Sequence, residues 1–298
     1  MEFKNLDQIK SYMRKEANRL GISINAAYVT YFSKDLLSRL SKINYGNLLV
    51  KGSFSQYVHL GELSRPVLDI DLSSLDNHNR PLILLYRSIY ESKDEIITYD
   101  VSKLPHQTPN GVYKIPVVAK IKFPCDSHFI VVPIGIDFKE KNQVIFETQY
   151  KPVLPLFQGD EKFYINTPSF EEHIAEKLYI ILHNKKTDVE NTRVKDFYDI
   201  YKLHGKDYDG DKFSLYFLTM LYMYGENISE VNSDFLNKEY INRHLEIWER
   251  MKTKYQFVDK SVELDEVVYY TKAVLNEQIQ KIRHGEFIEK AKTLAKIR

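Results

Sequence analysis

Apolar residues change their spacing along the chain, and the change divides it into two halves. In the first half, helical spacing over 6–20, ended by Gly21, and again over about 24–40 predicts two helices. A further helix is suggested at 80–92. The remaining apolar runs have the spacing of strands and cover 47–50, 67–72, 95–101, 113–123 and 129–138.

The second half has a different character. Strand signals fade, and from Pro168 onward helical periodicity takes over. A chain of 298 residues is long enough for two modest domains. We therefore predict an α+β fold with N-terminal helices and an α/β core over residues 1–160, followed by a C-terminal helical domain over residues 161–298.

Two acidic residues interrupt one of the extended runs. Asp69 and Asp71 stand two positions apart within 67–72, so on a strand both carboxylates point to one face while apolar residues point to the other. Like charges held this close repel each other unless a cation lies between them. Magnesium-assisted phosphoryl or nucleotidyl transfer uses such pairs, because hard oxygen ligands hold the metal against substrate phosphates. The alternative is a solvated strand face without a metal.

Two neighbouring segments add candidate groups. The apolar run that ends at Val50 leads into Lys51, Gly52 and Ser53, where glycine allows close approach to a phosphate and the serine can donate hydrogen bonds to it. Asp137 lies in the last apolar run of the first half, where an ionised carboxylate is costly unless it is paired or bound to a metal. The alternatives are a simple turn at Gly52 and a turn-capping role for Asp137.

The helical half begins with its own signals. Thr167 and Pro168 are typical of a helix start, as an N-cap and a first-turn residue. In the helix that follows, Lys177 borders the apolar stripe, where it can bury its stem and present its ammonium group to a cleft.

The next helix, predicted over 193–203, brings two carboxylates onto a semi-apolar side. These are Asp196 and Asp199, and carboxylates in such a position usually have a cationic partner. Lys177 and Arg193 are the candidate partners. The alternative to a functional role is a buried ion pair that only fixes the packing of the two helices.

Composition narrows the class of protein. With 43% hydrophobic and 28% charged residues and no tract long enough to cross a bilayer, the chain reads as a soluble globular protein without a membrane partner. A single cysteine excludes an intramolecular disulfide, and residues 1–10 lack the apolar core of a secretory signal, so we expect a cytoplasmic location. A net charge of +1 means that any nucleic-acid contact must come from a local basic patch, and the alternative for each such patch is ordinary solvated surface. The candidate patches are Lys114, Lys120 and Lys122; Lys185 and Lys186 with Arg193 and Lys195; and the tail over 281–298.

Taken in order, the motifs resemble two nested families. Gly52-Ser53 followed by Asp69-Ile-Asp71 resembles the active site of the polymerase-beta-like nucleotidyltransferases. Glu172-x-x-x-Glu176-Lys177-Leu, then Arg193-x-Lys-Asp196-x-Tyr-Asp199-Ile, resembles the C-terminal signature of the AbiEii/AbiGii nucleotidyltransferase toxins of type IV abortive-infection toxin–antitoxin systems. The spacer between Ser53 and Asp69 is unusually long for this pattern.

The resemblance implies a fold, a site and a reaction. The fold would be a mixed sheet with helices, followed by a helical domain. Magnesium or manganese would be held by Asp69 and Asp71, with Asp137 as the third carboxylate, and Lys177 with Asp196 would complete the catalytic groups. Residues Lys51, Gly52, Ser53 and Arg193 would bind the nucleoside triphosphate.

The resemblance also implies partners. A nucleoside monophosphate would pass to an RNA acceptor, expected to be the 3′ end of tRNA, and translation and growth would stop during phage infection. A cognate antitoxin, encoded separately, would repress transcription and need not bind the toxin. Two alternatives remain at this point: a small-molecule nucleotidyltransferase of the antibiotic-modifying kind, and a catalytically silent nucleotide-binding protein on the same fold.

Overall fold

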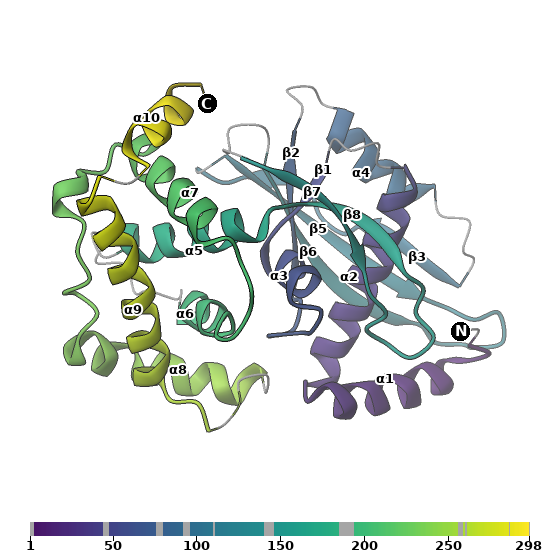
Figure 1. Ribbon diagram of the computed structural model, residues 1–298. Coiled ribbons are helices and arrows are strands. Elements are labelled where there is room, and N and C mark those ends of the chain that lie inside the picture. The colour runs from purple at the N-terminus through teal and green to yellow at the C-terminus, as the bar shows by residue number, and fades with distance from the viewer. Residues whose placement is uncertain are drawn as a thin grey trace. The chain divides into compact units, whose positions relative to one another are not determined.

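The computed structural model describes most of the chain (Figure 1). Its contacts group into two compact units, Met1–Gln143 with Thr148–Pro168, and Val144–Glu147 with Ser169–Arg298. The α+β class is confirmed. That residues 1–160 and 161–298 fold as independent domains stays a prediction. The described residues are 3–43, 48–75, 80–91, 96–109, 111–139, 146–184, 194–255, 259, 261–285 and 287–297.

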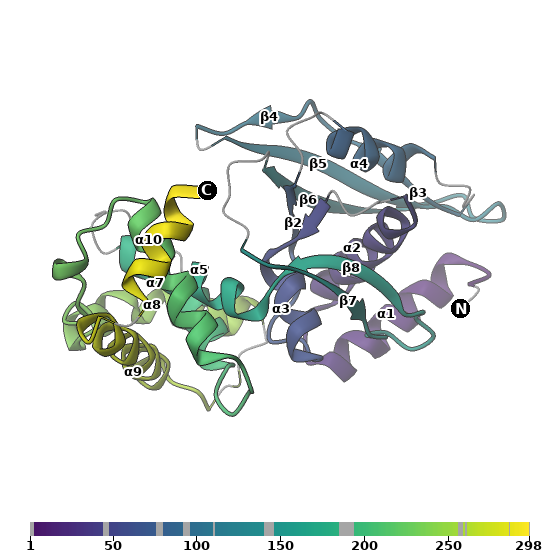
Figure 2. The same cartoon turned by 45° about the horizontal axis from the view of Figure 1, so that its top comes forward.

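A mixed sheet forms the centre of the first unit. Its order is β1-β2-β6-β5-β3, and β4 pairs with β5 off this path. Figure 2 shows β4 beside β5. β2 and β6 are parallel, whereas β1–β2, β5–β6, β3–β5 and β4–β5 are antiparallel. The strands are β1 (Leu48–Val50), β2 (Asp69–Ser74), β3 (Ile97–Val101), β4 (His106–Gln107), β5 (Val112–Ile121) and β6 (Ile130–Lys139).

Alternation along the strands decides which face of this sheet is buried. On β5, Ile115, Val117 and Ala119 are at most 1% exposed, while the residues between them are partly exposed. The inward residues pack with apolar side chains of α1 (Leu6–Leu20), α2 (Ile24–Ile43) and α4 (Arg80–Tyr90) in one core. The opposite face of the sheet is therefore left for polar chemistry.

The first helices follow the sequence closely. α1 begins after Asn5, whose side-chain oxygen accepts a hydrogen bond from the backbone amide of Gln8. It ends at Gly21, whose φ of 67° is the left-handed conformation that closes many helices. The predicted stop at Gly21 is confirmed, and α2 runs three residues further than the predicted 40.

A hairpin that the periodicity did not indicate precedes the helical half. It consists of β7 (Thr148–Val153) and β8 (Phe163–Pro168). The prediction that Thr167 and Pro168 start a helix is wrong. Thr167 pairs with Gln149 in the ladder, and its hydroxyl lies 2.5 Å from that of Ser55, so it cannot cap a helix. Helix α5 begins at Phe170 instead, and the Ser169 hydroxyl accepts a hydrogen bond from the Glu172 amide.

The second unit is helical, as predicted. Large side chains such as Phe197, Phe213 and Trp248 are fully buried in it. Among the described helices of the whole chain, none combines the length and apolar character needed to cross a membrane. The elements after β8 are α5 (Phe170–Asn184), α6 (Val194–Tyr201), α7 (Gly210–Met223), the short 3-10 helix Ile228–Glu230, α8 (Lys238–Tyr255), α9 (Leu264–Arg283) and α10 (Ile288–Ile297).

His59 makes the stability of the first unit depend on pH. Its Nε2 donates a hydrogen bond, 2.9 Å long, to the carbonyl of Pro168, and burial lowers its pKa from 6.5 to about 4. The unfolded chain binds this proton at a higher pH than the folded chain, so the stabilisation is complete above pH 6.5 and is lost as the pH falls towards 4.

We therefore predict that the melting temperature of the wild-type protein falls more steeply between pH 6.5 and 4 than that of His59→Gln. Thermal melts of both proteins across this pH range provide the measurement. Parallel curves for the two proteins would contradict the assignment to His59.

Candidate active site

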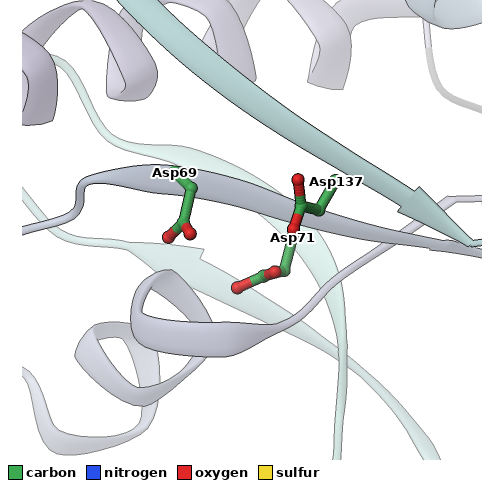
Figure 3. A group of neighbouring side chains, drawn as sticks. All are labelled: Asp69, Asp71 and Asp137. Atoms are coloured by element: carbon green, nitrogen blue, oxygen red, sulfur yellow. The ribbon is translucent and has the colours of Figure 1, made fainter. Parts of the chain in front are cut away.

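Three carboxylates meet on the polar face of the sheet. Asp69 and Asp71 lie on β2 and Asp137 on β6, and these strands are parallel neighbours with Asp71 directly beside Asp137. One carboxylate oxygen from each residue lies within 4.8 Å of the others, and all three residues are partly buried (Figure 3). The residue beside Asp69 is Gly135, which leaves that position without a side chain. The sequence pattern predicted the pair on β2 and the resemblance named Asp137 as the third carboxylate, and strand pairing brings Asp137 beside Asp71.

The mutual repulsion of these groups is partly offset by a lysine. Lys114 on β5 lies directly beside Asp137 in the register and forms an ion pair with its Oδ2. Sequence reasoning placed Lys114 in a general basic patch and did not connect it to Asp137. The signal that was available is its phase, because Lys114 alternates with the buried Ile115 and therefore faces the same side as the carboxylates.

The Gly-Ser turn lies against the same carboxylates. The backbone amide of Lys51 donates a 2.8 Å hydrogen bond to the carbonyl of Asp71, which fixes the turn to β2, and the Lys51 side chain is largely buried. Gly52 has a φ of 63° and begins α3 (Gly52–Leu60). A Cβ at this position would lie 1.7 Å from Oδ2 of Asp71. Only glycine therefore allows the start of the helix to approach the acidic group so closely.

Ser53 offers a buried donor at this point. Its Oγ is inaccessible to solvent and has no hydrogen-bond partner among the described residues. A buried hydroxyl without a partner is costly, and a ligand oxygen would satisfy it. The first amides of α3 add further donors and the positive end of the helix dipole, which together favour a phosphate.

The donor set of the sheet suits a hard divalent cation. Three carboxylates are the type of ligand that magnesium and manganese prefer. Because Gly52 carries no side chain, no side chain at this position separates the candidate cation site from the candidate phosphate site. The residues that are present therefore fit a metal held against a nucleotide.

The glycine gives a direct test of this arrangement. Gly52→Ala places an L residue at positive φ, which costs about 1–2 kcal/mol, and also forces Asp71 away. We expect it to abolish nucleotide binding measured by titration calorimetry. Gly61→Ala is the matched control, because Gly61 ends the same helix at a φ of 73° with nothing within 4 Å of an added Cβ.

Gly61→Ala should lose melting temperature through backbone strain alone, and its nucleotide binding should be unchanged. If both variants lose nucleotide binding to the same extent, strain in α3 rather than contact with Asp71 explains the loss.

A second charged group lies in the helical unit. Nζ of Lys177 on α5 is 2.6 Å from Oδ2 of Asp199 and 3.3 Å from Oδ1 of Asp196, both on α6. All three side chains are buried. Sequence reasoning named Lys177 as a candidate partner of both aspartates, and the resemblance selected Lys177 and Asp196. The structure confirms the pairing and makes Asp199 the closer partner. Arg193 lies outside the described residues.

Removal of the Lys177 ammonium group should show how much it contributes to stability. Lys177→Met leaves two buried carboxylates without this ammonium, and breaking a buried pair in this way costs about 3–5 kcal/mol. We expect a large fall in the free energy of unfolding, measured with urea, and substantial recovery in Lys177→Met combined with Asp199→Asn. A double variant no more stable than the single one would mean that Lys177 and Asp199 are not energetically coupled.

Comparison with known proteins identifies the family of the chain. Residues 35–274, most of the chain, match the family described as the nucleotidyl transferase AbiEii toxin of type IV toxin–antitoxin systems. The chain belongs to this family. The resemblance drawn from the motifs is thereby confirmed, and with it a nucleotidyltransferase fold. A family of toxins in toxin–antitoxin systems implies a nucleoside triphosphate substrate and a cognate antitoxin.

Solved structures support the fold of this AbiEii family member. JHP933 from Helicobacter pylori shares 14% sequence identity, covers 89% of this chain and 96% of its own, and superposes with a TM-score of 0.53. A second Helicobacter pylori protein, described as a candidate nucleotidyltransferase, shares 14% identity, covers 86% of this chain and 97% of its own, and has a TM-score of 0.52. At this identity the likeness concerns the fold alone. No curated protein matches the chain.

Proposed function

We propose that this AbiEii family member transfers a nucleoside monophosphate from a nucleoside triphosphate to a hydroxyl group of an RNA acceptor. The observation that carries the proposal is the convergence of Asp69, Asp71 and Asp137 within 4.8 Å of one another, next to the start of α3. Family membership supports the reaction class. In the reaction the acceptor oxygen bonds to the α-phosphorus while the bond to pyrophosphate breaks.

Each group of the first unit has a role in this proposal. The amides of Gly52 and Ser53, the Ser53 hydroxyl and Lys51 bind the triphosphate, where the helix dipole favours its charge. Asp69, Asp71 and Asp137 would hold magnesium or manganese. The metal, when bound, neutralises phosphate charge and lowers the pKa of the attacking hydroxyl.

The groups of the helical unit are proposed to act on the same nucleotide. Lys177 would stabilise the negative charge that develops on the phosphates, while Asp196 and Asp199 orient its ammonium group. Arg193 is assigned to nucleotide binding from the resemblance alone. Two acidic partners for one lysine support a positioning function, because both carboxylates lie within hydrogen-bond distance of Nζ.

The 3′ end of tRNA is the acceptor that we propose. Modification of this end would block translation and stop growth, which would account for a role in abortive infection of phage-infected cells. The site of action would then be the cytoplasm, and the cognate antitoxin could act on transcription without binding the toxin. A small-molecule acceptor is the competing proposal.

Label transfer tests the proposal. The protein is incubated with each labelled nucleoside triphosphate, magnesium and total cellular RNA, and we expect label in the tRNA fraction that disappears with a chelator. Asp71→Asn should reduce transfer by at least 100-fold, because it removes a charge from the metal-binding set. Asp100→Asn is the matched control, since Asp100 is an exposed carboxylate on β3 paired with Lys120.

The outcomes separate the candidate functions. Label on a small molecule would replace RNA with a small acceptor, and no label on any acceptor would overturn the transferase proposal. Expression should stop growth with the wild-type protein and with Asp100→Asn but not with Asp71→Asn. Growth arrest by Asp71→Asn would show that toxicity does not depend on the metal-binding carboxylates.

A further inference from the structure

Lys114 continues a row of side chains that starts at the candidate metal-binding carboxylates. Across the sheet, Asp71 on β2 lies beside Asp137 on β6, Asp137 beside Lys114 on β5, and Lys114 beside His106 on β4. Directly paired residues point to the same face of a sheet. The side chain of Lys114 is 44% exposed, against 21% for Asp137. The ammonium group therefore contacts the acidic site, while nearly half of the Lys114 side chain is exposed to solvent.

The order of the strands places Lys114 and the Gly-Ser turn on opposite sides of the carboxylates. β2 has β1 on one side and β6 on the other, and β1 leads directly into Gly52 and α3. Gly52 adjoins Asp71, whereas Lys114 adjoins Asp137. The acidic residues therefore separate the candidate phosphate-binding turn from the lysine.

The geometry of displacement at phosphorus places the triphosphate and the acceptor on different sides of the carboxylates. The attacking oxygen and the leaving pyrophosphate lie roughly in line, on opposite sides of the α-phosphorus. If the start of α3 holds the triphosphate, the acceptor hydroxyl arrives from the side of Asp137 and β5. An exposed cation on that side attracts an anionic acceptor and repels a cationic one.

We propose that Lys114 binds the backbone phosphate next to the reactive hydroxyl of the acceptor, and so selects a nucleic-acid acceptor over a cationic small molecule. The inference rests on the proposed function, since it takes the nucleotide to lie at Gly52. Lysine has three N–H donors, so its ammonium can keep Asp137 and donate to a phosphate at the same time.

Direct RNA binding tests this assignment without requiring catalysis. The probe is a fluorescent single-stranded RNA of ten nucleotides with a free 3′ hydroxyl, titrated with full-length protein and magnesium in the absence of nucleotide. We expect Lys114→Met to weaken binding by about tenfold and to lower the slope of log affinity against log salt by about 0.7, the effect of losing one phosphate contact on a single strand. Lys114→Arg should retain most of the affinity.

Lys120→Met is the matched control. Lys120 lies on the same strand and face and pairs with Asp100 at 3.1 Å, but it is six residues, about 20 Å, from Lys114. It should leave the affinity for the probe within twofold. An equal loss in both variants would indicate general attraction by surface charge and would overturn the assignment, as would unchanged affinity in Lys114→Met.

A second readout excludes an effect that acts only through Asp137. Manganese binding to the RNA-free protein, measured by electron paramagnetic resonance, should change less than threefold in Lys114→Met. A loss of manganese affinity as large as the loss of RNA affinity would make Lys114 a positioning residue for Asp137 and overturn the inference. If RNA binding depends on Lys114 but no label transfer occurs, Lys114 stands as an RNA-binding residue, whereas the transferase proposal and the placement of Lys114 beside a reactive hydroxyl fail. If the wild-type protein does not bind the probe, the inference fails by itself.

Discussion

Repulsion between Asp69, Asp71 and Asp137 is the constraint on which the first unit depends. Their oxygens lie within 4.8 Å of one another on partly buried side chains, where charges are less well screened than in water. Parallel pairing of β2 and β6 holds them together despite this repulsion. Lys114 provides one compensating charge, and the positive end of α3 provides another. A sheet that holds three carboxylates this close together favours the binding of a cation.

Glycine makes the space around these carboxylates. Gly135 leaves the position beside Asp69 empty, and Gly52 allows the first turn of α3 to touch Asp71. A side chain at either position would fill the region in which a metal and a phosphate are proposed to meet. The hairpin β7–β8 supports this arrangement from outside the main sheet, because Thr167 and Pro168 hold α3 through Ser55 and His59.

The helical unit contains a second group of buried charges. Lys177 is enclosed with Asp196 and Asp199, so each charge has an opposite charge at hydrogen-bond distance. Desolvation offsets much of the attraction within such a group, so the group adds little net stability. Its main effect is to fix the position of the ammonium group. In the sheet three carboxylates gather at one point and Lys114 pairs with Asp137, whereas in the helices Lys177 pairs directly with both Asp196 and Asp199. This difference is consistent with a cation-binding group in one unit and a positioned cation in the other.

Local pattern was sufficient for most elements and for the central motif. Period-two alternation placed Asp69 and Asp71 on one face, and the left-handed conformation available to Gly21 ended α1 where expected. Helical periodicity also identified the second half and placed Lys177 at the border of an apolar stripe, where the structure finds it buried against Asp196 and Asp199. The order of the motifs along the chain was enough to indicate the family to which it belongs.

Pairing between distant segments decided the rest. The contact of Lys114 with Asp137 depends on the register of β5 against β6. The close approach of Gly52 to Asp71, which would place an added Cβ 1.7 Å from Oδ2, depends on where β1 lies relative to β2. Thr167 has the local chemistry of a helix cap, but its ladder with Gln149 and its contact with Ser55 keep it in a strand. The sequence determined which residues could form a site, and tertiary pairing determined their partners, because register brings together groups whose separation along the chain carries no local signal.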